Sequence, residues 1–414
     1  MRPRRATDAV REALADTRVV LVNGARQAGK STLVRLVAQD RAAEWRTLDD
    51  PATLHAATED PTGFVDSGGL MVIDEIQRAP ELLLAIKRRV DLDQAPGQFL
   101  LTGSARVLGL RQLPDTLPGR METIELWPFS QGEIDEVPDT FVDAVFTLGA
   151  ERRHASRVTR TEYAERLVRG GFPEAVARTQ PTRRQRFLDS YVADLISRDV
   201  TQLSEIERTS EMAALVRLLA ARSGQLLVPT TVGSEARLPQ RTVERYLALL
   251  EEVFLIKRIP AWSRNLGTRA TATRKLALTD SGVAANLLGT TPRHLLRPGG
   301  AFGPLLEGFV LMEIARQLSW SSQRADLYHY RTRDNVEVDA VIENRRGEVV
   351  AIEVKAASTV RTEDFRGLRH LQQRLGDELI AGLVLYTGDQ TLPFGPRLRA
   401  MPVSALWQAT TPTP

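Results

Sequence analysis

The sequence predicts an α/β fold that begins with a parallel sheet, and three observations support this prediction. An apolar run at 19–22 is followed by a glycine-containing loop and a helical pattern from Thr32. Further apolar runs at 69–73 and 98–102 each end in polar residues. Buried parallel strands read as continuous apolar runs, and helices connect them. A second α/β region is expected near the C-terminus, where a helix precedes two strands that carry charges.

Length and composition limit the number of domains and the class of protein. The chain has 414 residues, enough for two or three domains with their own cores, and we expect three parts at 1–150, 151–290 and 291–414. It has no cysteine, which excludes disulfides, thiolate metal sites and cysteine catalysis and is compatible with a reducing cytosol. We expect a cytoplasmic protein without membrane partners, because no signal-peptide pattern and no apolar run of membrane-spanning length occurs.

The first functional motif is a phosphate-binding loop between the 19–22 strand and the next helix. Gly24 to Ser31 fit the pattern GxxxxGK[ST] at every fixed position. Glycines let backbone N–H groups point toward an anion at a helix N-terminus. Lys30 would reach the β- and γ-phosphates and Ser31 would bind Mg²⁺, so ATP and Mg²⁺ are the expected cofactors. The residues expected at the nucleotide are Gly24, Ala25, Arg26, Gln27, Ala28, Gly29, Lys30, Ser31 and Thr32.

Two adjacent carboxylates follow the next buried strand. Asp74 and Glu75 come directly after the apolar run at 69–73. The carboxyl ends of the strands are where open α/β sheets bind ligands. Asp74 would hold Mg²⁺ beside Ser31, and Glu75 would polarise the attacking water. The pair therefore predicts hydrolysis in addition to nucleotide binding.

The third buried strand ends in hydroxyl groups at the same edge of the predicted sheet. Thr102 and Ser104 follow the run at 98–102, where a hydroxyl would contact the γ-phosphate or the attacking water. Another strand is expected at 122–126, directly after Arg120.

The order of these motifs resembles the AAA-type P-loop ATPase domain of a widespread family of prokaryotic proteins, in which a domain of unknown function follows. The resemblance covers nearly the whole chain and rests on GARQAGKS, LMVIDEIQ, LLTGSA and LPGRMETIELWPFS. It implies the roles given above, with Thr102 or Ser104 as the sensor residue, and Arg120 in the place of an arginine finger. If Arg120 of one copy acts on the nucleotide of another copy, the protein must form a homo-oligomer. The alternative for Arg120 is a surface arginine that caps a turn.

The middle of the chain is expected to form a helical lid and a winged helix. Helices at 212–223, at 230–236 and from Pro239 precede strands at 254–259 and 275–278. A winged helix reads base edges with the N-terminal end of its recognition helix, so double-stranded DNA is an expected partner. In ATPases such domains also bind proteins, which is the alternative. The residues at that end are Gln240, Arg241, Thr242 and Arg245.

Clustered arginines are a second indication that the chain binds the phosphate backbone of a nucleic acid. The net charge of the chain is only +3, so position matters more than total charge. The alternative is an ordinary solvated helix face. The clustered residues are Arg152, Arg153, Arg157, Arg160, Arg183, Arg184 and Arg186.

The C-terminal part predicts a hairpin that brings two carboxylates together. Strands are expected at 336–342 and 349–355, and Arg345-Arg346-Gly347 suits a three-residue loop with its glycine in the left-handed region. Asp339 then lies opposite Glu353, with Cβ atoms roughly 5 Å apart. Lys355 shares their face because the strand period is two. Opposed like charges destabilise a sheet, so this pair requires a cation.

These residues resemble the core of PD-(D/E)xK nucleases. Asp339 and the segment from Glu353 to Lys355 occupy the two defining motifs, and Glu307 is the carboxylate on the preceding helix. Val338 stands where the motif has proline. The resemblance implies that Asp339 and Glu353 bind Mg²⁺ for phosphodiester hydrolysis. The alternative is a nuclease-like fold kept for binding, with the charges paired as a salt bridge.

The sequence as a whole predicts an AAA-type ATPase domain, a helical and winged-helix region, and a restriction-endonuclease-like α/β domain. The expected function is ATP hydrolysis coupled to DNA, with metal-dependent cleavage in the last domain. One alternative is a nucleotide-controlled switch that binds DNA or protein without cleavage. The other is a protein whose later domains bind only protein.

Overall fold

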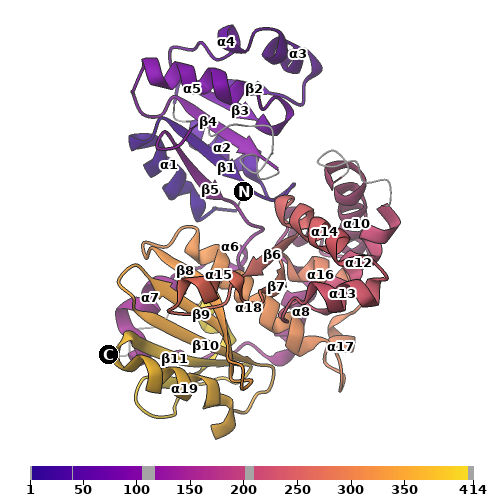
Figure 1. Ribbon diagram of the computed structural model, residues 1–414, viewed down its shortest axis with the longest axis vertical. Helices are drawn as coiled ribbons and strands as arrows, with labels where there is room; N and C mark the ends of the chain where they lie inside the picture. Colours follow the sequence, from indigo (N-terminus) through magenta and orange to yellow (C-terminus); the bar gives the residue numbers. More distant parts are fainter. Residues whose placement is uncertain (1, 40, 105–116, 201–208, 409–414) are drawn as a thin grey trace. The chain divides into compact units, whose positions relative to one another are not determined.

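A computed structural model describes residues 2–39, 41–104, 117–200 and 209–408 of the chain (Figure 1). The chain divides into two compact units. The first comprises Met1–Pro128 with Glu252–Phe254, and the second comprises Phe129–Glu251 with Leu255–Pro414. Apart from Glu252–Phe254, the parts predicted at 151–290 and 291–414 fall within the second unit.

The first unit contains a five-stranded parallel sheet in the order β2-β3-β4-β1-β5. The strands predicted at 19–22, 69–73, 98–102 and 122–126 each lie within one residue of their predicted positions. Every residue of β1, β3 and β4 is buried, which explains their continuous apolar runs, because strands covered on both faces need apolar side chains on both. The strands are β1 (Val19–Asn23), β2 (Ala43–Thr47), β3 (Leu70–Asp74), β4 (Phe99–Gly103) and β5 (Met121–Glu125).

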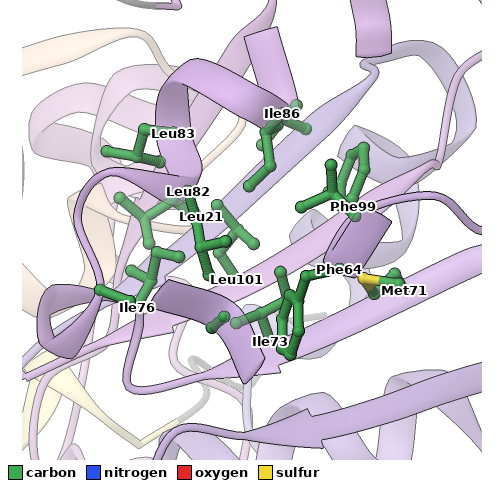
Figure 2. Close-up of a cluster of buried hydrophobic side chains, with 14 of the residues drawn as sticks. Leu21, Phe64, Met71, Ile73, Ile76, Leu82, Leu83, Ile86, Phe99 and Leu101 are labelled. Carbon is green, nitrogen blue, oxygen red and sulfur yellow. The ribbon is translucent and has the colours of Figure 1, made fainter. Parts of the chain in front are cut away.

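Helices cover both faces of this sheet. One core packs side chains of β1, β3 and β4 against α5 and α4, and Figure 2 shows Leu21 and Leu101 near Leu82, with Ile73 beside Phe64. The other core packs α1 and α2 against the opposite face. The helices are α1 (Ala6–Asp16), α2 (Lys30–Ala38), α3 (Pro51–Glu59), α4 (Pro61–Phe64) and α5 (Leu82–Leu92).

The second unit begins with short helices, and those after residue 159 lie where the sequence predicts a helical region. Two of them start with capping boxes, Ser130 with Glu133 and Thr159 with Glu162, which satisfy free N–H groups at the helix start. The helices are α6 (Gln131–Asp135), α7 (Phe141–Leu148), α8 (Arg160–Arg169), α9 (Pro173–Ala177) and α10 (Pro181–Asp194), followed by a π-helical turn, η4 (Leu195–Val200).

Three helices and a hairpin follow in the predicted order, and we call residues 209–278 the helix–hairpin segment. Strands β6 (Ile256–Ile259) and β7 (Lys275–Leu278) pair antiparallel. Leu226 forms a further antiparallel bridge with Lys275. The helices are α12 (Thr209–Ala221), α13 (Pro229–Ala236), α14 (Gln240–Glu252) and, between the two strands, α15 (Leu266–Thr271).

The C-terminal part forms a six-stranded mixed sheet in the order β12-β13-β11-β10-β9-β8. Helix α18 (Phe302–Leu318) packs against β7 and β10, and α19 (Arg366–Leu375) packs against β10 and β11. Helices α16 (Ser281–Leu287) and α17 (Pro292–Leu295) precede them. The strands are β8 (Ala325–Arg331), β9 (Glu337–Asn344), β10 (Val349–Lys355), β11 (Leu379–Tyr386), β12 (Leu392–Pro393) and β13 (Leu398–Pro402).

The hairpin between β9 and β10 confirms the predicted loop and register. Gly347 has φ +80° and donates its N–H to the Asn344 carbonyl at 3.0 Å. The paired residues run from Glu343 opposite Val349 to Ala340 opposite Ile352. The register therefore places Asp339 and Glu353 at the next position.

Among the described residues, no helix combines the length and the apolar character needed to cross a lipid bilayer.

A buried histidine lies inside the second unit. The His154 ring bonds through Nε2 to Ser404 Oγ at 2.9 Å, and its backbone N–H donates to Thr391 Oγ1 at 2.8 Å. Burial, together with the positive charge of Arg152, lowers the pKa of His154 to about 4 from its ordinary value of 6.5. The folded chain therefore holds this ring neutral.

This histidine makes stability depend on pH. At His154 the unfolded state binds more protons than the folded state between pH 6.5 and 4, so the contribution of this residue to the unfolding free energy falls as the pH falls through this window, by up to about 1.4 kcal/mol per pH unit. His154→Gln should remove this contribution to the pH dependence measured by urea denaturation. The control is His294→Gln, which changes an exposed histidine of the same unit. Equal pH slopes in the wild type and His154→Gln would contradict the prediction.

Candidate nucleotide site and C-terminal carboxylate site

The phosphate loop connects β1 to α2 and needs glycine at both of its ends. A Cβ atom on Gly24 would lie 2.0 Å from the carbonyl oxygen of Leu126, so only glycine fits there. Gly29 has φ +96° and caps α2, whose first residue is Lys30. The loop therefore ends at a helix N-terminus, as predicted.

An arginine outside the motif supports the loop. Arg4 donates hydrogen bonds of 2.6 Å to the carbonyl oxygens of Ala28 and Trp127. Its guanidinium thereby links the loop to the chain that follows β5. This role was not predicted, because an arginine near the N-terminus gives no local sign of its distant partners.

The loop lysine and serine occupy the positions that the motif requires. The Lys30 amino group is buried and donates to the carbonyl oxygens of Gly24 and Ala25, each at 3.0 Å. Ser31 Oγ donates to the Asp74 carboxylate at 3.0 and 3.1 Å. The structure thus brings together the residues expected to contact phosphate and Mg²⁺.

The two carboxylates point to different partners because the chain turns sharply between them. Asp74 ends β3, whereas Glu75 has a left-handed backbone with φ +61°. Thr102 Oγ1 donates to Asp74 at 2.5 Å and accepts the Glu75 N–H at 3.0 Å. Thr102 is fully buried. It therefore fixes both acidic residues at the end of β4.

Gln77 is a site residue that the sequence analysis missed. Its amide nitrogen donates to the Glu75 carboxylate and to Ser104 Oγ, the latter at 2.8 Å. The Ser104 N–H donates back to the Gln77 side-chain oxygen at 3.3 Å. Its position two residues after Glu75, in LMVIDEIQ, was the available signal.

The edge of the sheet fits a nucleotide with Mg²⁺. Ser31 and Asp74 supply oxygen atoms, which Mg²⁺ prefers, and the loop supplies N–H groups at a helix N-terminus. Lys30 would exchange its two carbonyl partners for phosphate oxygens. Glu75 and Ser104 lie at the same edge, held by Gln77.

Arg120 lies at the amino ends of the strands, opposite the end that carries the phosphate loop. Its carbonyl oxygen accepts the N–H of Val19, which starts β1, and the phosphate loop follows the far end of that strand, about 16 Å away at 3.3 Å per residue. The Arg120 side chain pairs with Asp91. The structure therefore does not bring Arg120 to the phosphate loop of its own chain, and an arginine finger in trans stays a prediction.

The C-terminal carboxylates meet at the end of the β9–β10 hairpin. Asp339 Oδ2 accepts the Val354 N–H at 2.8 Å. Lys355 Nζ donates to Glu353 Oε1 at 2.8 Å. Glu307 approaches from α18. The structure thus brings together all four predicted residues.

A fifth residue, Lys275, occupies the centre of this group and was missed. Its Nζ lies 2.9 Å from Asp339 Oδ1, 2.5 Å from Glu307 Oε1 and 3.4 Å from Glu337 Oε1. The side chain is 1% exposed. The sequence showed Lys275 only as the first residue of a strand, without any sign of its partners.

Burial and neighbouring charges shift the pKa values of the residues in this carboxylate group. Burial, with repulsion by Asp339, raises the pKa of Glu307 to about 8 and that of Glu353 to about 7. Burial alone would lower the pKa of Lys275, but Asp339 and Glu307 outweigh it and raise that pKa above its ordinary value. Lys275 therefore stays charged.

The expected Mg²⁺ site does not fit this arrangement. Within the described ranges, no three His, Cys, Asp or Glu side chains are placed to hold a metal ion. The ammonium of Lys275 already bonds the oxygen atoms of Asp339 and Glu307. Lys275 takes the place expected for the metal ion in this arrangement, and a metal bound by Asp339 and Glu353 stays a prediction.

A cavity of about 430 Å³ adjoins the carboxylates. The Gly224 backbone has φ +87°, and a Cβ atom there would lie 3.1 Å from Glu307 Cβ, so the chain passes close to α18. The lining residues are Gly224, Gln225, Leu226, Glu307, Arg331, Glu337, Asp339 and Glu353.

The predicted DNA-contacting residues lie at the start of α14. Gln240, Arg241 and Arg245 are exposed, and Thr242 is half-buried. Gln240 donates to the Glu244 carboxylate at 2.8 Å. These side chains are therefore accessible to a partner.

Two of the clustered arginines serve the fold instead of the surface, which corrects their predicted role. Arg152 is buried and donates to the Ala405 carbonyl at 2.8 Å. Arg184 donates to the carbonyls of Ala175 and Arg178 at 3.0 and 2.7 Å. The remaining members are exposed: Arg153, Arg157, Arg160, Arg183 and Arg186.

Three family models match consecutive parts of the chain. Residues 16–135 match a family model described as an AAA domain. Residues 160–294 and 302–406 match two models described as domains of unknown function, DUF8612 and DUF4143. The first unit is thus an AAA-type P-loop ATPase domain, whereas the matches to the second unit carry no functional description.

Similarity to particular proteins extends over nearly the whole chain. Uncharacterised proteins of Mycobacterium tuberculosis and Mycobacterium bovis are each 28% identical over 406 residues, which cover 97% of this chain and 84% of theirs.

Solved structures with detectable similarity include two motor or ATPase proteins. A Walker-type ATPase of Pyrococcus abyssi is 17% identical, covers 70% of this chain and 96% of its own, and has a TM-score of 0.44. A Holliday junction branch migration motor of Thermotoga maritima is 19% identical, with 62% and 86% covered and a TM-score of 0.29.

Thr102→Val tests the hydroxyl that holds both acidic residues of the nucleotide site. The substitution keeps the shape but leaves the buried Glu75 N–H without its partner, so we expect the first unit to lose about 1–2 kcal/mol of unfolding free energy. The matched control is Thr123→Val, at an exposed position of β5. Urea denaturation measures both variants, and equal losses would contradict the role of Thr102.

Proposed function

We propose that the chain is an Mg-ATP-hydrolysing ATPase whose second unit binds double-stranded DNA. The observation that carries the proposal is the network at the carboxyl edge of the first sheet, where Thr102 joins Asp74 to Glu75 and Ser31 donates to Asp74. Positioning and charge neutralisation are most of what phosphoryl-transfer catalysis requires. This network supplies the groups for both.

The loop and strand residues would have distinct roles in hydrolysis. Lys30 and the loop N–H groups bind the phosphates, and Ser31 and Asp74 hold Mg²⁺, which neutralises phosphate charge when bound. Glu75 orients the attacking water and accepts its proton. Gln77 positions the Glu75 carboxylate relative to Ser104, through the hydrogen bonds that it makes to both.

We further propose that the helix–hairpin segment is a winged helix. Its order of helix, short bridge at Leu226, two helices and hairpin supports this assignment. Arg241 and Arg245 are exposed at the start of α14, where this motif contacts DNA. The exposed arginines of the clusters would add phosphate contacts.

Metal-dependent cleavage by the C-terminal domain is a second candidate function. It is favoured by the meeting of Glu307, Asp339, Glu353 and Lys355 at one end of the β9–β10 hairpin. A nucleotide-controlled switch without cleavage is the alternative, and the salt bridges of Lys275 favour it in the present arrangement.

ATP turnover tests the first part of the proposal. Lys30→Ala should abolish Mg²⁺-dependent hydrolysis and weaken nucleotide binding. Glu75→Gln should lower kcat at least 100-fold but keep nucleotide binding, because Glu75 acts on the attacking water. Glu122→Gln, at an exposed position of β5, is the charge-matched control. Phosphate release and nucleotide titration measure the two effects. Undiminished turnover in Glu75→Gln would overturn its role.

The salt dependence of DNA binding tests the second part. Each phosphate contact that is removed should reduce the slope of log Kobs against log[salt] by about 0.9, so the double variant Arg241→Ala with Arg245→Ala should lose about two units. Arg88→Ala, which removes an exposed arginine from α5 of the first unit, is the control. Fluorescence anisotropy with duplex DNA gives the slopes. Identical slopes for wild type and double variant would favour a protein partner.

A further inference from the structure

Lys275 is an unusual residue to find in the interior of the second unit. Lysine is almost never fully buried unless it is paired, and Lys275 is 1% exposed. Its partners come from two other elements, Glu307 from α18 and Asp339 with Glu337 from β9. The lysine itself belongs to β7 of the helix–hairpin segment.

We propose that the Lys275 ammonium is an internal cation that fills the place of a divalent metal ion and keeps the carboxylate site closed. The carboxylate site is the group Glu307, Glu337, Asp339 and Glu353. The inference rests on the second candidate function, because it concerns control of the residues that would perform cleavage.

The donor atoms explain why one cation excludes the other. Asp339 uses Oδ2 to accept the Val354 N–H, which leaves Oδ1 for Lys275. The same ammonium takes Glu307 Oε1. A metal ion at this point needs these two oxygen atoms, and an ammonium, which can only donate, repels it.

Without the ammonium the site has the chemistry of a hard-cation site. Glu307, Asp339 and Glu353 all line the same cavity of about 430 Å³. Among the described residues, Glu353 Oε2 is buried without a hydrogen-bond partner. Carboxylate oxygens in such a cavity are the ligands that Mg²⁺ and Mn²⁺ prefer. Removing one positive charge therefore favours the entry of another.

The origin of Lys275 connects this site to the helix–hairpin segment. Strand β7 pairs with β6 on one side, and on the other Gly224 donates its N–H to Leu276 and Leu227 donates to Arg274. The carboxylates belong instead to α18, β9 and β10. A displacement of β7 away from those elements would withdraw the ammonium from the carboxylates.

Binding of Mn²⁺ to the nucleotide-free full chain tests this inference without any activity measurement. Lys275→Met keeps the length of the side chain and removes its charge. It should bind one more Mn²⁺ per chain than the wild type in electron paramagnetic resonance titration. Lys275→Arg keeps the charge and should bind no more than the wild type. The double variant Lys275→Met with Asp339→Asn should not bind the extra Mn²⁺ ion, because it lacks the Asp339 carboxylate that would be a ligand.

Thermal denaturation gives an independent readout. Mn²⁺ should raise the Tm of Lys275→Met but not that of wild type, because a ligand that binds only the folded state stabilises it. If Lys275→Met does not fold, Lys275→Met with Glu337→Gln removes one of the uncompensated charges and takes its place. A folded, Lys275-free variant that binds no additional Mn²⁺ would overturn the inference and leave Lys275 as a structural ion pair.

The two proposals fail in different ways. Absence of ATP turnover in the wild type would refute the proposed ATPase and would not change the Mn²⁺ titration. Absence of the extra Mn²⁺ would refute the closed metal site and leave ATP hydrolysis untouched.

Discussion

The Asp74 carboxylate is the interaction on which the nucleotide site depends. It accepts hydrogen bonds from Ser31 at the start of α2 and from Thr102 at the end of β4. Elements that are distant in the sequence are thereby fixed at one edge of the sheet. A buried carboxylate without such partners would be strongly unfavourable, so the same bonds that organise the site also stabilise the fold around it.

Features that depend on near neighbours could be predicted from the sequence. The central strands were located because strands buried on both faces must be apolar throughout. The turn at Gly347 set the register of β9 and β10, and that register brought Asp339 and Glu353 together. The site at Asp74 followed from the parallel order of the strands, whose carboxyl ends must share an edge.

Features that depend on distant partners could not be predicted in the same way. Lys275 is 64 residues from Asp339 and 32 from Glu307, and nothing near it in the sequence indicates either partner. Like charges on opposed strands require a cation between them. Nothing in the strand pattern indicates that this cation is a side chain. Arg152 and Arg184 were misjudged for a related reason, because backbone carbonyls that bind guanidinium groups leave no mark in a sequence.

The two carboxylate groups differ in the kind of donor that faces them. Asp74 meets the hydroxyls of Ser31 and Thr102, and a hydroxyl can rotate and offer a lone pair to an incoming cation. Asp339 meets the Lys275 ammonium, which carries a full positive charge and has no lone pair to offer. A divalent ion can therefore enter the first group without moving the backbone. The second group must first lose Lys275, so access to it depends on strand β7.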